Sequence, residues 1–99
     1  MNEIEQVLDK NSASYRCLSK RGGVYELYHV STFKGHRKAR NGEDHLVTVE
    51  VWDAGPNQNN HRYFVEVRDE DAGTTATGNP ESTIERALDM THWAELDAK

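Results

Sequence analysis

The clearest pattern along the chain is an alternation of apolar and polar residues at positions 63–68. An aromatic or β-branched residue stands at Tyr63, Val65 and Val67, and this period of two is typical of a half-buried strand. Residues 69–73 then supply turn chemistry, and residues 74–77 are short and partly β-branched. The stretch therefore predicts a β-hairpin.

A helix is expected directly after this hairpin, over about residues 80–96. Asn79 followed by Pro80 is one start signal, because asparagine caps free N–H groups and proline suits the first helical position. A second start signal is Ser82 with Glu85, which together form a capping box. The helix should thus begin between Asn79 and Thr83.

The predicted helix has one apolar face. At 100° per residue this face collects Ile84, Ala87, Leu88, Thr91 and Ala94, with Met90 at its edge. We expect Ile84 and Leu88, one turn apart, to be buried against a sheet. Trp93 lies nearly opposite Ile84, and it either packs along a sheet edge or the N-terminal segment, or serves as an exposed anchor for a partner.

The remaining elements follow from weaker patterns. Strands are expected at residues 24–33, with apolar groups on both sides, at residues 46–52, and less firmly at residues 15–18. Residues 2–10 predict a short helix that must dock on the rest of the chain. Residues 19–23 predict a turn, and residues 34–44 and 53–60 predict loops.

These elements predict an α+β fold in one domain spanning residues 1–99. The simplest architecture is an antiparallel β-meander of four or five strands, with the C-terminal helix packed on one face and a short N-terminal helix. Hydrophobic residues make up 35% of the chain and charged residues 29%, so the core should be thin. No run approaches the roughly 20 apolar residues that span a bilayer.

Several residue counts bear on the compartment and on partners. Cys17 is the single cysteine and lies in the weak strand prediction, so a buried thiol in a reducing cytoplasm is expected, and no secretory signal is visible. The net charge of −5 is unevenly distributed. Residues 16–40 carry seven Lys and Arg against one carboxylate, whereas residues 41–99 carry four against thirteen.

The sequence contains no recognisable catalytic or metal-binding motif. The histidines lack helical i, i+4 pairing, so metal ligation is not expected of His29, His36, His45, His61 or His92. The alternative is a surface transition-metal site formed by His36 and His45. The carboxylates at residues 69–71 should be solvated at their turn, and no nucleophile has a recognisable base. The sequence therefore predicts a protein that is not an enzyme and has no cofactor and no metal.

The end of the chain resembles two families in the order of its elements. Residues 46–96 resemble the double-stranded-RNA-binding domain, whose order is α-β-β-β-α. That family grips phosphates with basic residues at the start of its last helix. Here those positions hold Glu81, Ser82, Thr83 and Glu85, so that binding surface does not carry over.

The second family is the small HicB-type antitoxins, which residues 69–78 and 84–94 resemble. In those proteins a strand with acidic turn residues precedes a helix led by glycine, and the proline-and-glycine segment expected between them is missing here. The strings at residues 76–80 and 92–97 also look like uncharacterised small bacterial proteins, which implies no function.

Two binding hypotheses lead, and an enzyme is a third class that would require a concave pocket holding titratable groups with perturbed pKa values. The first is a binding or regulatory module that acts through contacts with an unknown protein, with Trp52 and Trp93 as partner-binding residues; its acidic half could imitate nucleic acid as an inhibitor. The alternative is RNA binding through the basic segment 16–40, which the net charge disfavours. Its candidate residues are Lys34, Arg37, Lys38 and Arg40, with Arg16, Lys20 and Arg21 upstream.

Overall fold

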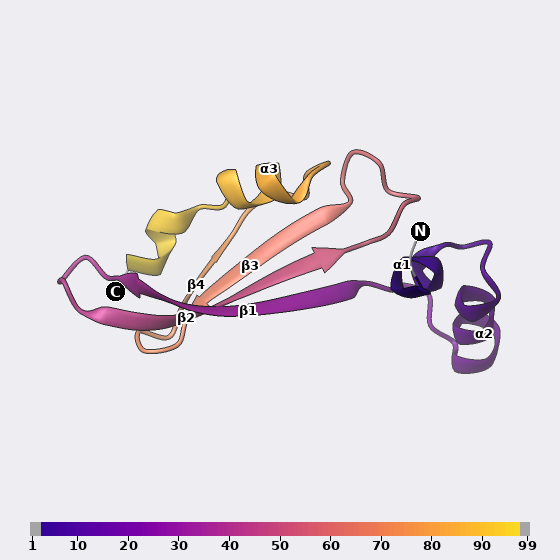
Figure 1. The fold of residues 1–99 in the computed structure, drawn as a ribbon, viewed down its shortest axis with the longest axis horizontal. Coiled ribbons are helices and arrows are strands. Elements are labelled where there is room, and N and C mark those ends of the chain that lie inside the picture. Colours follow the sequence, from indigo (N-terminus) through magenta and orange to yellow (C-terminus); the bar gives the residue numbers. More distant parts are fainter. Residues whose placement is uncertain (1–2, 98–99) are drawn as a thin grey trace.

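The computed structural model describes residues 3–97 and is built around one antiparallel sheet (Figure 1). In chain order the elements are α1 (Glu3–Leu8), α2 (Ala13–Gly22), β1 (His29–Lys38), β2 (Asp44–Asp53), β3 (Tyr63–Asp69), β4 (Thr74–Thr77), α3 (Ile84–Asp89) and a 3₁₀ helix, η1 (Trp93–Asp97). The strands are arranged in the order β1-β2-β3-β4. The predicted α+β meander is therefore confirmed, with four strands.

The strand register divides the sheet into two faces. Val49 of β2 lies between Phe33 of β1 and Val67 of β3, and Val67 lies opposite Ala76 of β4. These side chains share the face that α3 and η1 cover, which we call the covered face (Figure 1). The other face, which we call the second face, carries residues of the opposite parity, because successive side chains in a strand alternate.

The core lies between the covered face and the C-terminal segment. Its buried members come from β2, β3, β4, α3 and η1: Val47, Val51, Val65, Val67, Ala76, Ala87 and Leu96. Leu96 is the largest of them and is 1% exposed. Hydrogen bonds tie η1 to β4, since the Thr74 hydroxyl donates to Leu96 O at 2.6 Å. The last turn of the chain is thus a structural part of the core.

The predicted C-terminal helix is shorter than its sequence pattern. Helix α3 begins after Thr83, whose hydroxyl accepts the Arg86 N–H at 3.1 Å, so neither proposed start signal is the cap. It ends at Asp89, and the chain turns at Met90 before η1. Thr91 is buried and its hydroxyl donates to Ala87 O. Ile84 is 43% exposed and Leu88 is half-buried, so the predicted burial of Ile84 is wrong.

The N-terminal half departs further from the predictions. Residues 15–18 lie within α2 and not in a strand, because Ser12 caps that helix by accepting the Tyr15 N–H at 3.1 Å. The turn predicted at residues 19–23 is instead the end of the same helix. Cys17 is exposed on α2, so its predicted burial is wrong.

The boundaries of the first strand also differ from the prediction. β1 runs from His29 to Lys38, so residues 34–38 of the predicted loop are strand, whereas residues 24–28 form no strand. β1 is paired with β2 along its whole length. Pairing with the strongly patterned β2 imposes an extended conformation on a polar segment.

The molecule is elongated. Its Cα radius of gyration is 16.0 Å, against about 13 Å for a compact domain of 100 residues. Figure 1 shows why: α1 and α2 lie beyond the end of the sheet where β1 begins, while α3 and η1 lie along the sheet itself. A hollow forms where the N-terminal segment meets the sheet.

Candidate functional site

A concave site lies where the N-terminal segment meets the second face of the sheet, and we call it the aromatic hollow. Its volume is about 470 Å³, within the range of roughly 300–1,000 Å³ typical of binding pockets. Its lining comes from α1, α2 and the residue Lys10 between them, from the segment before β1, from β2, β3 and the loop that joins them, and from Pro80 before α3. The lining residues are Leu8, Lys10, Tyr15, Tyr25, Glu26, Leu27, Tyr28, Trp52, Ala54, Gln58, His61, Arg62, Phe64 and Pro80.

Aromatic side chains dominate the wall that the sheet supplies. Trp52 of β2 lies directly opposite Phe64 of β3, and both belong to the second face. Tyr28 packs edge-on against Trp52, with ring centroids 5.7 Å apart and planes at 72°. Edge-to-face packing of this kind fixes ring orientation. The strand register thus holds a rigid aromatic floor.

One polar group in this floor has no partner. Nε1 of Trp52 is buried, and no hydrogen-bond acceptor among the described residues reaches it. Leaving a buried donor unpaired costs about 1–3 kcal/mol. Tyr25, by contrast, is 85% exposed at the mouth of the hollow. The lining of the hollow therefore includes both an exposed aromatic ring and a tryptophan whose indole N–H is buried without a partner.

The loop between β2 and β3 shapes the rim of the hollow. Arg62 donates to both carboxylate oxygens of Asp53, at 2.7 and 3.0 Å, and its guanidinium lies 4.9 Å from the centre of the Tyr63 ring. Burial alone would raise the pKa of Asp53, but the hydrogen bonds from Arg62 and the Gly55 N–H outweigh it and hold that pKa below its ordinary value. The rim is thus an ordered ion pair.

Gly55 is the point at which the N-terminal segment is seated on this rim. Its φ is 99°, and a Cβ added to it would lie 2.8 Å from Cβ of Leu8. Leu8 is 3% exposed. Close approach of the two segments at this glycine holds the helical wall of the hollow against the sheet.

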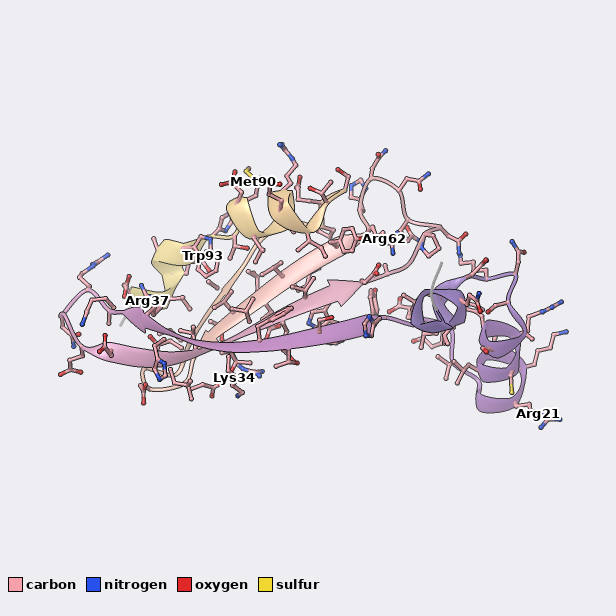
Figure 2. All side chains as sticks on the ribbon, viewed as in Figure 1. Arg21, Lys34, Arg37, Arg62, Met90 and Trp93 are labelled. Atoms are coloured by element: carbon pink, nitrogen blue, oxygen red, sulfur yellow. The ribbon has the colours of Figure 1, made fainter. Side chains whose placement is uncertain are left out.

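Trp93, the other predicted partner-binding residue, lies far from the hollow along the sheet (Figure 2). It is 40% exposed on η1, and its Nε1 donates to Leu88 O at 2.9 Å. Met90 nearby is 47% exposed. The two tryptophans therefore do not form one site: Trp52 lines the hollow, and Trp93 covers the end of α3.

The basic residues proposed for nucleic-acid binding are largely engaged within the protein. Arg37 donates to both oxygens of Asp97, at 3.1 and 2.8 Å, and these bonds raise its pKa. Lys38 lies 2.8 Å from Asp44. Lys34 donates to the Thr48 hydroxyl at 2.9 Å, and Arg40 is exposed at the hairpin end.

Asp69 is the centre of this charged cluster. The prediction of a solvated turn carboxylate is wrong for it, because Asp69 is 1% exposed. Burial would raise its pKa, but the Ala72 N–H, His45 and the Asp71 N–H together lower it. His45 Nδ1 lies 2.6 Å from its carboxylate, and this bond raises the pKa of His45. The cluster joins β1, β2, β3 and η1.

No local pattern in the sequence indicates the aromatic hollow. Its rings come from positions as distant as Tyr15 and Phe64, and only the fold brings them together. Trp52 was singled out as a tryptophan, whereas Tyr25 and Tyr28 were assigned to a strand that does not include them. An isolated aromatic pair just outside a strand was the signal that sequence reasoning overlooked.

Comparison with known proteins identifies no family and no similar protein for this chain. No protein-family model matches the chain, and neither the curated proteins nor the solved structures searched contain a significant match. Across residues 3–97 no helix has the length and apolar character needed to cross a bilayer. The same residues contain no group of three or more His, Cys, Asp or Glu placed to hold a metal ion.

Proposed function

We propose that this protein is a non-enzymatic binding module that holds a segment of a partner protein in the aromatic hollow. The observation that carries the proposal is the buried, unpaired Nε1 of Trp52, a residue that lines the aromatic hollow. A backbone carbonyl of an extended peptide is the acceptor that such a donor suits. The surrounding rings supply apolar area at low entropic cost, as recognition aromatics commonly do.

The rim chemistry is consistent with peptide recognition. Lys10 and Glu26 both line the hollow, so each sign of charge is available to a polar segment. Arg62 is held by Asp53 and contributes shape. The single exposed thiol, Cys17, fits work in the reducing cytoplasm.

The two indole N–H groups make the proposal directly testable. The chain has two tryptophans, so ¹H–¹⁵N spectra show two indole signals that mutation assigns. Peptides selected for binding from a displayed library should shift the Trp52 signal and leave that of Trp93 in place. Tyr25→Ala should weaken binding by about 1–2 kcal/mol, or roughly five- to thirtyfold, without unfolding the protein, because Tyr25 is 85% exposed.

Trp93→Ala is the matched control, since it removes an exposed aromatic residue outside the hollow. It should leave peptide affinity unchanged. A library that yields no binder, or binders that depend on Trp93 and not on Tyr25, would refute the proposal. The second result would move the partner contact to η1.

A second candidate function is nucleic-acid binding, and the position of α2 favours a narrower form of it. Arg16, Lys20 and Arg21 are exposed on α2, and none of them forms an ion pair with a described residue (Figure 2). Affinity for RNA should then fall steeply as the salt concentration rises. The double substitution Lys20→Ala and Arg21→Ala should reduce the slope of log affinity against log salt concentration by the amount expected for about two phosphate contacts. The pair Arg37→Ala and Lys38→Ala is the control. No RNA binding at low salt ends this alternative.

The idea of an acidic inhibitor that imitates nucleic acid stays a prediction. Many of the carboxylates in the acidic half have intramolecular partners, including Asp53 with Arg62 and Glu81 with Arg86. Arg68 lies within 3.6–3.8 Å of three glutamates on the second face. Partial neutralisation of this kind is why we place the partner contact at the aromatic hollow.

A further inference from the structure

One edge of the sheet is a long strand with no neighbour. β1 has ten residues, and no strand within residues 3–97 borders its outer side. The opposite edge is short and covered, because β4 has four residues and the His92 N–H of the following segment donates to Thr77 O at 3.1 Å. An edge strand with unpaired N–H and C=O groups is a template for pairing with another strand.

The hydrogen bonds of the β1–β2 hairpin identify the groups that face this free edge. The Ala39 N–H donates to Glu43 O at 2.8 Å, and bonded pairs recur at every second residue of an antiparallel ladder. The Glu70 N–H donates to Leu46 O at 2.9 Å, which gives β2 the same alternation. The outward-facing residues of β1 are therefore Val30, Thr32, Lys34, His36 and Lys38.

Lysines on an edge strand commonly block pairing with a further strand. The two outward-facing lysines of β1 instead contact side chains of β2. Nζ of Lys34 lies 2.9 Å from the Thr48 hydroxyl, and Nζ of Lys38 lies 2.8 Å from the Asp44 carboxylate. Both partners belong to β2, on the side away from the edge. The backbone of β1 is thus accessible along its outer side.

We propose that two copies of the protein pair through β1 about a two-fold axis and form a continuous antiparallel sheet. In such a ladder each outward-facing residue of one copy must lie opposite an outward-facing residue of the other copy. The two-fold axis must therefore pass at the position of one residue, which then lies opposite its own copy. Only two such registers pair all but one residue of the ten-residue strand. One is centred on Phe33 and the other on Lys34.

Charge selects between the two registers. The register centred on Lys34 places this residue directly opposite itself in the second copy, and like charges directly opposite destabilise a ladder. The register centred on Phe33 places Thr32 opposite Lys34 and Val30 opposite His36. It brings no two lysines or arginines into opposition. The strand is therefore self-complementary about Phe33.

Phe33 itself supplies the apolar centre of this interface. It is 58% exposed in the single chain although it lies on the covered face, beside half-buried Val49. In the chosen register the two Phe33 rings meet across a non-hydrogen-bonded pair, where Cα atoms are about 4.5 Å apart and aromatic pairs stabilise most. A second copy of the chain is therefore the partner that suits both the charges along β1 and the Phe33 ring. Closed two-fold dimers are also the commonest oligomers.

The first test measures mass in solution. Sedimentation across micromolar to millimolar concentrations should show a species of twice the chain mass of 11.3 kDa. Thr32→Pro removes an outward-facing N–H without removing a bond to β2, so it should abolish the dimer and leave the circular dichroism unchanged. Thr75→Pro, at an outward-facing position of the opposite edge, is the control and should remain dimeric. A monomeric wild type, or a dimeric Thr32→Pro, overturns the proposal.

The second test reads the register and does not depend on the proline variants. In a Cys17→Ser background, Phe33→Cys should form an intermolecular disulfide under mild oxidation, because its two Cα atoms lie within bonding reach. Lys34→Cys should not, since in this register its two copies are diagonal and farther apart than about 7 Å. Faster cross-linking of Lys34→Cys than of Phe33→Cys would overturn the register. No residue of β1 itself lines the aromatic hollow, so either outcome leaves the peptide-binding proposal standing.

Discussion

Replacing Leu96 by alanine tests how the C-terminal segment covers the sheet. Leu96 is 1% exposed and packs in the core cluster with Val67 and Ala76. Truncation of a fully buried leucine costs about 2–5 kcal/mol, because transfer free energy is lost and a cavity remains. A small domain has only about 5–15 kcal/mol of stability in total. Leu96→Ala should therefore remove a large share of it.

Two neighbouring residues give a graded comparison. Leu88 is half-buried, so Leu88→Ala should cost about 1–2 kcal/mol, roughly half the value for a buried leucine. Ile84 is 43% exposed, and Ile84→Ala should cost less than about 1 kcal/mol. The expected order of destabilisation is Leu96, then Leu88, then Ile84. It differs from the order that helical periodicity predicts, in which Ile84 and Leu88 are equivalent.

Equilibrium unfolding in urea, followed by circular dichroism, measures these differences. All variants should be compared at one protein concentration, because self-association would stabilise the folded state. An unchanged m-value with a shifted midpoint identifies a change in stability. The reasoning fails if Ile84→Ala costs as much as Leu96→Ala, or if Leu96→Ala leaves the midpoint in place. Either result would mean that η1 does not close the core.

Two further predictions concern the charged cluster around Asp69 and the contact between Gly55 and Leu8. The NMR titration should give His45 a pKa above its ordinary value, and Asp69→Asn should abolish the rise. Because the pKa of His45 is raised in the folded state, its contribution to the free energy of unfolding is complete below the pKa of the unfolded state. That contribution is lost as the pH rises through the folded pKa. A urea midpoint that stays constant between these two pKa values would contradict this. Gly55→Ala should destabilise by roughly 1–3 kcal/mol more than Gly42→Ala, since both have positive φ but only Gly55 abuts Leu8; equal melting temperatures would contradict that contact.

The sheet is the part of the fold that the sequence specifies most directly. The strands predicted at residues 46–52, 63–68 and 74–77 correspond to β2, β3 and β4, with differences of at most two residues at any end. In each of β2 and β3 a row of valines marks the covered face, as at Val51 and Val65. Alternation reports burial of one face, so these strands could be read without knowledge of the fold.

β1 and the C-terminal segment could not be read in this way. The covered-face positions of β1 include Ser31, Gly35 and Arg37, which carry no apolar alternation, and the strand exists because β2 pairs with it. Helix α3 stops early because the chain beyond it makes contacts from distant positions, such as the His92 N–H with Thr77 O. Contacts between remote positions leave no local pattern.

The candidate site was even less accessible to sequence reasoning. The partner-binding role of Trp52 was predicted from residue type alone, and the rings that meet it come from separate elements. The basic segment was interpreted by its charge, but the acceptors of Arg37 lie far along the chain. Charge counts cannot distinguish a cation that is free for a partner from one that is already paired.

The ion pair between Arg37 and Asp97 has a consequence for the order of folding. These two residues are 60 positions apart, whereas each hairpin of the meander joins strands that follow one another directly. Closing long loops costs more entropy and comes later than closing short ones. The meander should therefore form before η1 docks. The C-terminal segment would then dock last, on a sheet that is already formed.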